Sequence, residues 1–259
     1  MKAVMLWKHD YGPSLCGGLA LTPLVLAGAL LVLSTGCDSA GTGNEDVAAP
    51  RHMEGVTLDA PSIAGWASEV EEYKRGDEAN SYTDPEEAVG QASGVATEVL
   101  VLGRGGAVTL AFEEPIGDAE GAELAVFENG LGTVEELFAE LAYLEISSNG
   151  DDFARFPVRT FRSEPVDAYE RVDAREYSGF AGLHPKGTGT AFDFAELSDH
   201  PKVIEGTVDL TSIRYVRVVD VVGDGRERDS DGNPIYDPYP TTGTAGFDLD
   251  GVAFLEGTP

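Results

Sequence analysis

Short apolar runs broken by turn residues dominate the chain from residue 98 onward. The runs are EVLVLG (98–103), GAVTLAF (106–112), AELAVFENG (122–130), AYLEISSNG (142–150), FARFPVRTF (153–161), IRYVRVVDVV (213–222) and FDLDGVAFLE (247–256). In the second run Val108, Leu110 and Phe112 alternate with Thr109 and Ala111, which is the period of a strand with one buried face. The pattern predicts a series of short strands with almost no amphipathic helix between them.

These strands favour an all-β fold, an antiparallel β-sandwich of jelly-roll type that forms a single domain with long loops over residues 56–257. Asn149, Gly150 and Asp151 stand between two runs and predict a hairpin turn, because Asn and Gly tolerate positive φ. The tetrapeptide Gly-Arg-Gly-Gly at 103–106 is interpreted as another hairpin turn, since it lacks the Lys-Ser/Thr pair and the helix of a phosphate-binding loop.

Two segments depart from the strand pattern. Residues 44–95 are polar and rich in Glu, Ala, Gly and Ser, and they predict irregular structure with a short helix near residues 67–74. Residues 133–142, TVEELFAELA, have a capping threonine and helical spacing. This second segment fits either a helix or a loop that enters the next strand.

The N-terminal segment predicts an export signal. Two lysines precede an apolar run at residues 19–33, and small residues lead from it to Cys37. We interpret residues 1–37 as a lipoprotein signal peptide with Cys37 as the acylated residue, and residues 38–55 as a flexible tether. Because Ser34 stands where such signals usually carry a large apolar residue, an ordinary secretory signal or a single transmembrane anchor is the alternative.

Charge and cysteine content narrow the function classes. The chain has 17 basic and 46 acidic residues, and removal of residues 1–37 takes away two lysines and one aspartate, which changes the net charge from −29 to −30. Such a surface repels nucleic acid and anionic lipid, so the membrane would be reached through the lipid anchor. A composition with few lysines and many acidic residues favours a halophilic source, in which salt screens the repulsion between the carboxylates. The alternative is an acidic protein that its charge keeps soluble. Both cysteines, Cys16 and Cys37, lie in the signal segment, which leaves none for a disulfide or a Cys-based zinc site.

No enzyme motif stands out. The sequence contains neither a G-x-S-x-G nucleophile elbow nor an H-E-x-x-H zinc motif. Beyond the signal segment the histidines are His52, His184 and His200, and a histidine beside a proline is more often a loop residue than a base. The many acidic residues offer so many pairs that a glycosidase pair cannot be picked out by counting. The sequence therefore favours a non-enzymatic protein.

The segment 221–254 places many carboxylates, glycines and prolines between two apolar runs. Side-chain oxygens in this loop and on its flanking strands suit calcium, which takes roughly six to eight oxygen ligands. Because Pro234 and Pro240 stand where an EF-hand needs Gly and Glu, the loop is not an EF-hand. The alternative is a solvated acidic turn, which would not need the stiffening prolines and the tyrosines beside them. The predicted calcium ligands are Asp220, Asp224, Asp229, Asp231, Asn233, Asp237, Asp248 and Asp250.

Several blocks in a fixed order carry a resemblance. They are GAVTLAFEEPIGDAEGAELAVFENG, FAELAYLEISSNGDDFARFP, GFAGLHPKGTGTAFDFAEL, IRYVRVVDVVGDG and DGNPIYDPYPTTGTAGFDLDGVAF. Together, over residues 90–254, they resemble a family of bacterial exported β-sandwich proteins usually labelled only "cell surface protein", whose members carry lipoprotein signals or sorting tags. Leu141 departs from the family, which often has proline there. The closing FDLDGVAF is also similar to the last strand of galactose-binding-like jelly-roll modules with a structural calcium, which points to Asp248 and Asp250.

The resemblance implies an exported binding or structural module, because no catalytic constellation belongs to the shared blocks. Loops at strand ends are where such folds place recognition. The plainer alternative is that the glycines of these loops only make turns, that Glu128 joins the ion site, and that the aromatic residues are core. The predicted ligand-binding residues are Glu128, Asn129, His184, Tyr236 and Tyr239, with Trp66 as a further candidate for stacking.

Three functions follow as hypotheses. The favoured one is a lipid-anchored, calcium-stabilised protein of the cell surface or outer membrane that binds an extracellular glycan or another small molecule. The second is a nutrient-capture lipoprotein that works with an outer-membrane transporter, for example on a corrinoid. The third is a glycoside hydrolase or lyase that uses Glu128 or an aspartate of the long loop as its acid.

Overall fold

The structure is a computed structural model that describes residues 54–256. These residues all belong to one compact unit. The expected signal peptide, its Cys37 and nearly all of the expected tether lie outside the described residues.

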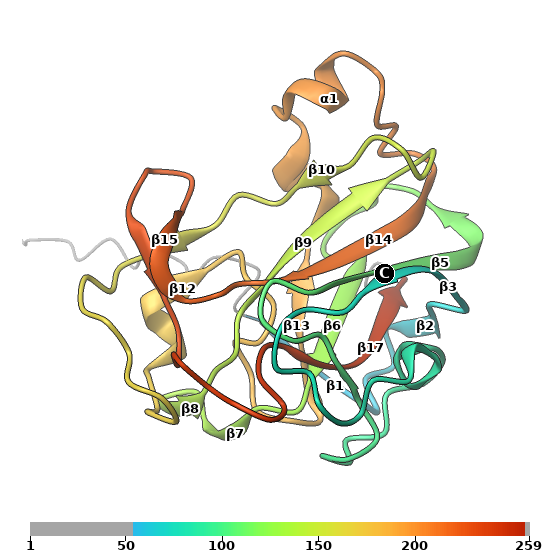
Figure 1. Cartoon of the computed structure of the whole chain (residues 1–259). Coiled ribbons are helices and arrows are strands. Elements are labelled where there is room, and N and C mark those ends of the chain that lie inside the picture. Colours follow the sequence, from blue (N-terminus) through green and yellow to red (C-terminus); the bar gives the residue numbers. More distant parts are fainter. Residues whose placement is uncertain (1–53, 257–259) are drawn as a thin grey trace, which may run out of the picture. The chain divides into compact units, whose positions relative to one another are not determined.

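Two larger sheets form most of the described fold (Figure 1), and every strand pair in them is antiparallel. The first has the order β1-β13-β6-β17-β2, with β4 paired to β17: β1 Gly55–Thr57, β13 Thr188–Phe192, β6 Leu124–Glu128, β17 Asp248–Leu255, β2 Ile63–Trp66 and β4 Leu100–Val101. The second has the order β10-β9-β14-β5-β3: β10 Ala154–Arg155, β9 Ala142–Ser147, β14 Ile213–Asp220, β5 Ala107–Ile116 and β3 Glu69–Lys74.

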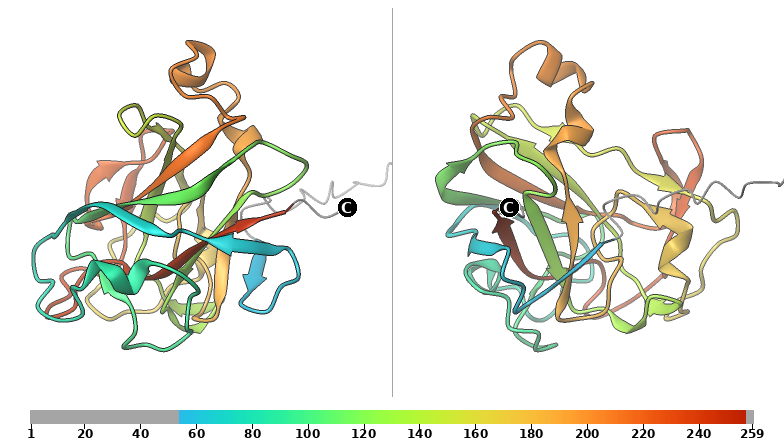
Figure 2. Two further views of the ribbon diagram at one scale, coloured as in Figure 1. Left: turned by 90° about the vertical axis from the view of Figure 1, so that its right-hand side faces the viewer. Right: turned by 180° about the vertical axis from the view of Figure 1, so that it is seen from behind.

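Three small hairpins and four short helical segments complete the described part. The hairpins are β11 Arg159–Thr160 with β12 Tyr177–Ser178, β15 Asp224–Arg228 with β16 Pro234–Tyr236, and β7 Leu131–Thr133 with β8 Glu136–Phe138. The helical segments are η2 Pro85–Ala88, η3 Ala174–Glu176, η4 Phe194–Leu197 and α1 Pro201–Ile204, each with a capping side chain at its N-terminus. Helix α1 lies at the opposite end from the β7–β8 hairpin (Figure 2).

The main hydrophobic core takes side chains from both larger sheets. Val126 of β6 and Val252 of β17 share one buried cluster with Leu110 of β5 and Val218 of β14. These β-branched and aliphatic residues fit the pleated surface of a strand and bury one face of each sheet. The antiparallel, all-β fold predicted from the strand pattern is confirmed.

Two local predictions need correction, and one alternative that the sequence leaves open is decided. Residues 67–74 do not form a helix, because β3 occupies most of them and pairs with the edge of β5. Residues 133–142 are not a helix: they contain the strand β8 and chain that leads into β9, in keeping with the loop alternative. Residues 103–106 make a turn but not a hairpin, because β4 and β5 belong to different sheets. The hairpin at Gly150, whose φ is 82°, is confirmed by the pairing of β9 with β10.

Candidate functional site

A cavity of about 320 Å³ opens where β6 ends and β17 begins, beside the β7–β8 hairpin. Its lining comes from loops and strand ends that are far apart in the sequence, and it contains no lysine or arginine. Loops gathered on a rigid sheet are the usual place for recognition, because they can vary without loss of the core. We call this feature the strand-end cavity.

Three carboxylates line the strand-end cavity: Glu128, Glu140 and Asp248. Glu128 ends β6 and Asp248 begins β17, and the antiparallel pairing of these strands places the two residues next to each other, with Leu249 opposite Glu128. Glu140 lies just before β9, and its Oε1 accepts a hydrogen bond from the Gly246 N–H at 3.1 Å. Two neighbouring strands and a loop thus bring three acids to one place.

Burial raises the pKa of all three acids. Glu128 and Glu140 are only 3% and 5% exposed. Burial, and next the charge of Asp248, raises the pKa of both glutamates well above their usual range. Burial raises the pKa of Asp248 to about 7. Since a buried charge without a partner is costly, this set of carboxylates favours the binding of protons or of a cation.

Only some of the oxygens of these carboxylates accept a hydrogen bond from the described residues. Oε2 of Glu128 accepts from the Gly130 N–H at 2.6 Å, and Asn129 donates Nδ2 to Oδ2 of Asp248 at 3.2 Å and to the Ala96 carbonyl at 3.0 Å. Oδ1 of Asp248 is shielded from solvent and has no hydrogen-bond partner within the described residues. Such orphaned buried acceptors are rare and call for an explanation.

Aromatic side chains form the outer wall of the strand-end cavity. Tyr82 and Tyr169 line it and are 44% and 61% exposed. Both have positive φ, 55° and 65°, in the left-handed region that costs a bulky residue energy. The ring of Tyr169 stacks on that of Phe138, with centroids 6.1 Å apart and planes 20° apart. Backbone strain of this kind gathers at ligand clamps, and here it presents aromatic faces to solvent.

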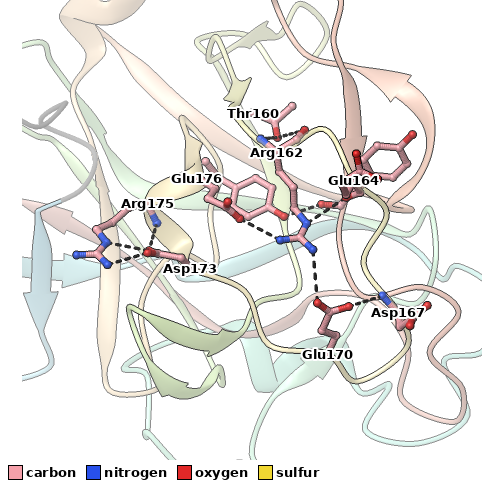
Figure 3. A network of polar contacts seen from close by, with 10 residues as sticks. Thr160, Arg162, Glu164, Asp167, Glu170, Asp173, Arg175 and Glu176 are labelled. Atoms are coloured by element: carbon pink, nitrogen blue, oxygen red, sulfur yellow. Dashed lines mark hydrogen bonds and ion pairs between the residues drawn. The ribbon is translucent and has the colours of Figure 1, made fainter.

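Charged residues hold the segment between β11 and β12 that carries Tyr169 (Figure 3). Arg162 donates Nη1 to Glu176 at 3.1 Å and Nη2 to Glu170, the neighbour of Tyr169, at 3.5 Å. The phenol oxygen of Tyr169 accepts from the Thr242 N–H at 3.3 Å. The segment is therefore tied at Glu170, next to the tyrosine, and the Thr242 contact holds the ring of Tyr169 at the cavity.

The predicted calcium ligands in the long loop do not gather around one point. Asp229 is 6% exposed and accepts from the N–H groups of Thr160, Asp231 and Asn233 at 2.7–3.0 Å. Burial acts against ionisation, but these hydrogen bonds outweigh it and lower the pKa of Asp229. Asp231 is exposed and pairs with Arg159 at 2.9 Å. Asp229 therefore stabilises the turn that follows it by accepting backbone hydrogen bonds.

Among the remaining predicted calcium ligands, Asp220 and Asp250 tie strands to loops, and Asp237 ties the chain after β16 to the chain before β9. Asp224 accepts from Arg226 within β15, and Asn233 donates its side-chain amide to Asp229. Burial raises the pKa of Asp220 to about 8, and the pKa of Asp237 well above its usual range. Of the eight predicted ligands, Asp248 alone lines the strand-end cavity. The backbone N–H donors are those of Gly105 and Phe247 for Asp220, Leu141 for Asp237, Ser93 and Gly94 for Asp250, and Arg226 for Asp224, at 2.8–3.0 Å.

Only some of the predicted ligand-binding residues lie at the strand-end cavity. Glu128 and Asn129 line the strand-end cavity, whereas His184, Tyr236 and Tyr239 do not. His184 is 7% exposed. The ring of Tyr236 packs against the second hydrophobic cluster, and a guanidinium lies 5.6 Å from the ring centroid of Tyr239.

Trp66, the third stacking candidate, packs against the core ring of Phe127 with centroids 5.2 Å apart. Its position fits the plainer alternative, in which the aromatic residue is part of a hydrophobic cluster.

A second acidic group lies at the other end of β6. Within residues 54–256, Asp118, Glu123 and Asp193 are the one group of three acids whose ligand atoms lie within 4.8 Å of one another, and it could hold a metal ion. Both oxygens of Glu123 already accept backbone N–H groups, from Ala119 at 2.9 Å and Phe194 at 2.7 Å. Burial, in the main, raises the pKa of Glu123 to about 7.

A larger cavity, of about 420 Å³, is lined by residues of both charge signs, among them Arg155, Glu196 and Arg228. The Arg155 guanidinium lies 4.0 Å from the ring centroid of Tyr143, so one face of the lining aromatic is already covered. Tyr143 is also buried, so this cavity offers a ligand less aromatic surface than the strand-end cavity, where Tyr82 and Tyr169 are exposed.

Sequence reasoning missed Glu140, Tyr82 and Tyr169. A usable signal existed for the first, because Leu137, Ala139 and Leu141 alternate with Phe138 and Glu140 in the sequence, which in a strand places residues 138 and 140 together on one face. No pattern marks Tyr82 and Tyr169 beforehand, since each is a single tyrosine in a polar segment.

Comparison of the chain with models of known protein families and with curated proteins finds no match. Across residues 54–256, no helix is long and apolar enough to cross a membrane.

Proposed function

We propose that the protein is an exported, lipid-anchored β-protein that binds an extracellular glycan in the strand-end cavity. The observation that carries this proposal is the pair Tyr82 and Tyr169, both exposed, both at positive φ and both at a cavity that also holds buried carboxylates. Evolution retains local strain chiefly where it serves a function.

The chemistry of the cavity suits a neutral sugar. The C–H face of a sugar ring packs on an aromatic face, and its hydroxyl groups donate hydrogen bonds to carboxylate and amide oxygens. Since the lining has acids but no lysine or arginine, an anionic glycan is disfavoured. A volume of about 320 Å³ lies at the small end of the range of roughly 300–1,000 Å³ for small-molecule sites. This size supports a short glycan segment over a corrinoid.

The membrane anchor is supported by the signal-like segment that ends at Cys37 and by the resemblance to exported cell-surface proteins. Calcium belongs to the proposal as a structural ion, supported by the acidic groups of the fold. Replacement of the proposed acylation site, Cys37→Ser, should release the protein from membranes in cell fractionation. If the variant stays with the membrane fraction, the anchor is not at Cys37.

Glycan binding is tested by isothermal titration calorimetry on the full chain with a panel of neutral oligosaccharides. Tyr82→Ala and Tyr169→Ala should each weaken binding about tenfold, equivalent to ~1.4 kcal/mol. Phe161→Ala is the matched control, because Phe161 is 70% exposed and does not line the cavity. Binding of no neutral glycan, or equal binding by the tyrosine variants and the wild type, would refute the proposal.

A glycoside hydrolase is the second candidate, because three carboxylates of raised pKa share one cavity with aromatic walls. In this candidate Glu128, whose pKa is raised by burial, would serve as the general acid. Turnover of an oligosaccharide by the wild type, lost in Glu128→Gln while binding persists, would favour the hydrolase. Binding without turnover across the panel would favour the binding protein.

A further inference from the structure

The acids of the strand-end cavity have no lysine or arginine partner in the described part of the chain. None of the ion pairs formed among residues 54–256 by lysine or arginine involves Glu128, Glu140 or Asp248. Their hydrogen-bond donors are neutral: backbone N–H groups, a threonine hydroxyl and the amide of Asn129. Burial of several carboxylates together without compensation costs several kcal/mol per charge.

Asp248 adds an independent observation. Its Oδ2 accepts from Asn129, but its Oδ1 is shielded from solvent and has no hydrogen-bond partner among the described residues. Asp248 also lines the cavity. A buried, unpartnered carboxylate oxygen at a cavity wall is an acceptor without a donor, and a bound cation would satisfy it.

We propose that Glu128, Glu140 and Asp248 hold a divalent cation in the strand-end cavity, and that this cation is calcium. All three ligands are hard oxygen donors, and no cysteine or histidine lines the cavity, which disfavours zinc and copper. Calcium accepts irregular geometry and mixes carboxylate, amide, carbonyl and water oxygens. The proposal deepens the calcium part of the proposed function and does not depend on the glycan part.

The geometry sets the form of the site. These three acids are not a group whose ligand atoms all lie within 4.8 Å, so a side chain must turn toward the ion when it binds. Oε2 of Glu140 is available as a ligand atom, since both of its hydrogen bonds among the described residues use Oε1. The ion would face the cavity, and its remaining coordination positions would be open to water or to ligand hydroxyl groups.

The test is calorimetric titration of calcium into the full chain after treatment with a chelator, at constant high salt and without glycan. The wild type should bind calcium, and Glu140→Gln and Asp248→Asn should each weaken this binding about tenfold or more, since fewer ligand charges lower affinity. Glu123→Gln tests the rival acidic group, because it neutralises one of that group's acids. The control is Glu71→Gln, because Glu71 is exposed and belongs neither to that group nor to the cavity lining. Both variants should bind calcium as the wild type does.

Thermal unfolding separates binding from a folding defect. In chelator, Asp248→Asn should melt at or above the wild-type temperature, because the substitution removes a carboxyl group whose ionisation is disfavoured by burial. In calcium the order should reverse, since only the wild type gains the full binding energy.

Three results would overturn the inference: no calcium binding by the wild type, wild-type calcium affinity in both Glu140→Gln and Asp248→Asn, or loss of binding in Glu123→Gln alone, which would move the site to the other group. Repetition of the glycan panel in chelator keeps the two proposals apart. Glycan binding without any calcium binding would refute the cation site and leave the glycan proposal standing. Calcium binding without glycan binding would refute the glycan proposal and leave the cation site standing.

Discussion

Replacement of Asp229 by alanine should destabilise the protein by about 2–4 kcal/mol, although Asp229 was first expected to be a calcium ligand. Its carboxylate accepts hydrogen bonds from the Thr160 N–H at 3.0 Å, the Asp231 N–H at 3.0 Å, the Asn233 N–H at 2.7 Å and the Asn233 side-chain amide at 3.1 Å. A hydrogen bond to a charged group contributes about 1.5–3 kcal/mol.

The four donors do not contribute equally. Thr160 is 5% exposed, so its N–H loses its acceptor in a place that water reaches poorly, at a cost of about 1–3 kcal/mol. Asp231 and Asn233 are exposed, and water can replace the lost bonds there. The estimate therefore rests mainly on Thr160, with a smaller contribution from the opened turn.

Urea unfolding of the full chain, followed by circular dichroism at constant salt, measures this effect. Asp231→Ala is the control, because it removes an exposed ion pair whose side chains are both 54% exposed, worth about 0–1 kcal/mol. The difference between Asp229→Ala and wild type should be the same in calcium and in chelator. Equal losses for Asp229→Ala and Asp231→Ala, or a loss seen only in calcium, would refute the reasoning.

The pH dependence of this loss has a defined sign. The folded pKa of Asp229 is lowered, so its stabilising contribution is complete above the unfolded value of roughly 3.9 and disappears as pH falls through the folded pKa. The gap between Asp229→Ala and wild type should therefore narrow in acid. A gap that widened in acid would contradict the hydrogen-bond account.

Three further predictions concern other parts of the fold. Tyr82→Gly should relieve the left-handed backbone at φ 55° and raise the free energy of unfolding by up to about 1 kcal/mol while it weakens glycan binding, and a loss of stability in urea unfolding would contradict this. Gly189→Ala would place a Cβ 2.9 Å from the Phe127 ring, and it should cost about 1–3 kcal/mol, visible as a lower Tm, whereas an unchanged Tm would mean that the ring moves freely. Burial raises the pKa of Asp220 to about 8, above the roughly 3.9 of the unfolded chain, so stability in chelator should fall as pH rises from 4 to 8, and Asp220→Asn should flatten this slope in thermal unfolding.

Strand positions were predictable from the sequence because each strand carries its own signal. The period-two pattern at 106–112 identifies β5 without knowledge of its partners, and the turn at Gly150 follows from residue chemistry. Residues 67–74 were mistaken for a helix because β3 is a mostly exposed edge strand, in which only Val70 and Tyr73 are partly buried. Its pairing with β5, a long-range contact, decides the conformation.

The site was predictable only in part, because it depends on pairing between distant segments. Glu128 and Asp248 were identified from loops and strand ends, but their adjacency follows from the register of β6 on β17. The same register removes the expected ion cage, since Asp250, two residues further along β17, contacts the backbone of Ser93 instead. Counting acids in an acidic sequence cannot separate a carboxylate that faces a cavity from one that anchors a loop.

The acidic surface and the buried acids should respond to different cations. Exposed carboxylates repel one another through water, so monovalent salt screens them over about 10 Å at 0.1 M, and general stability should rise with sodium chloride. Glu128 and Glu140 are shielded from this screening because they are 3% and 5% exposed. A response to calcium that persists in molar sodium chloride therefore reports on the buried acids, whereas a response that sodium chloride removes reports on the surface. The two responses can be told apart because the three cavity acids have no lysine or arginine partner in the described part of the chain.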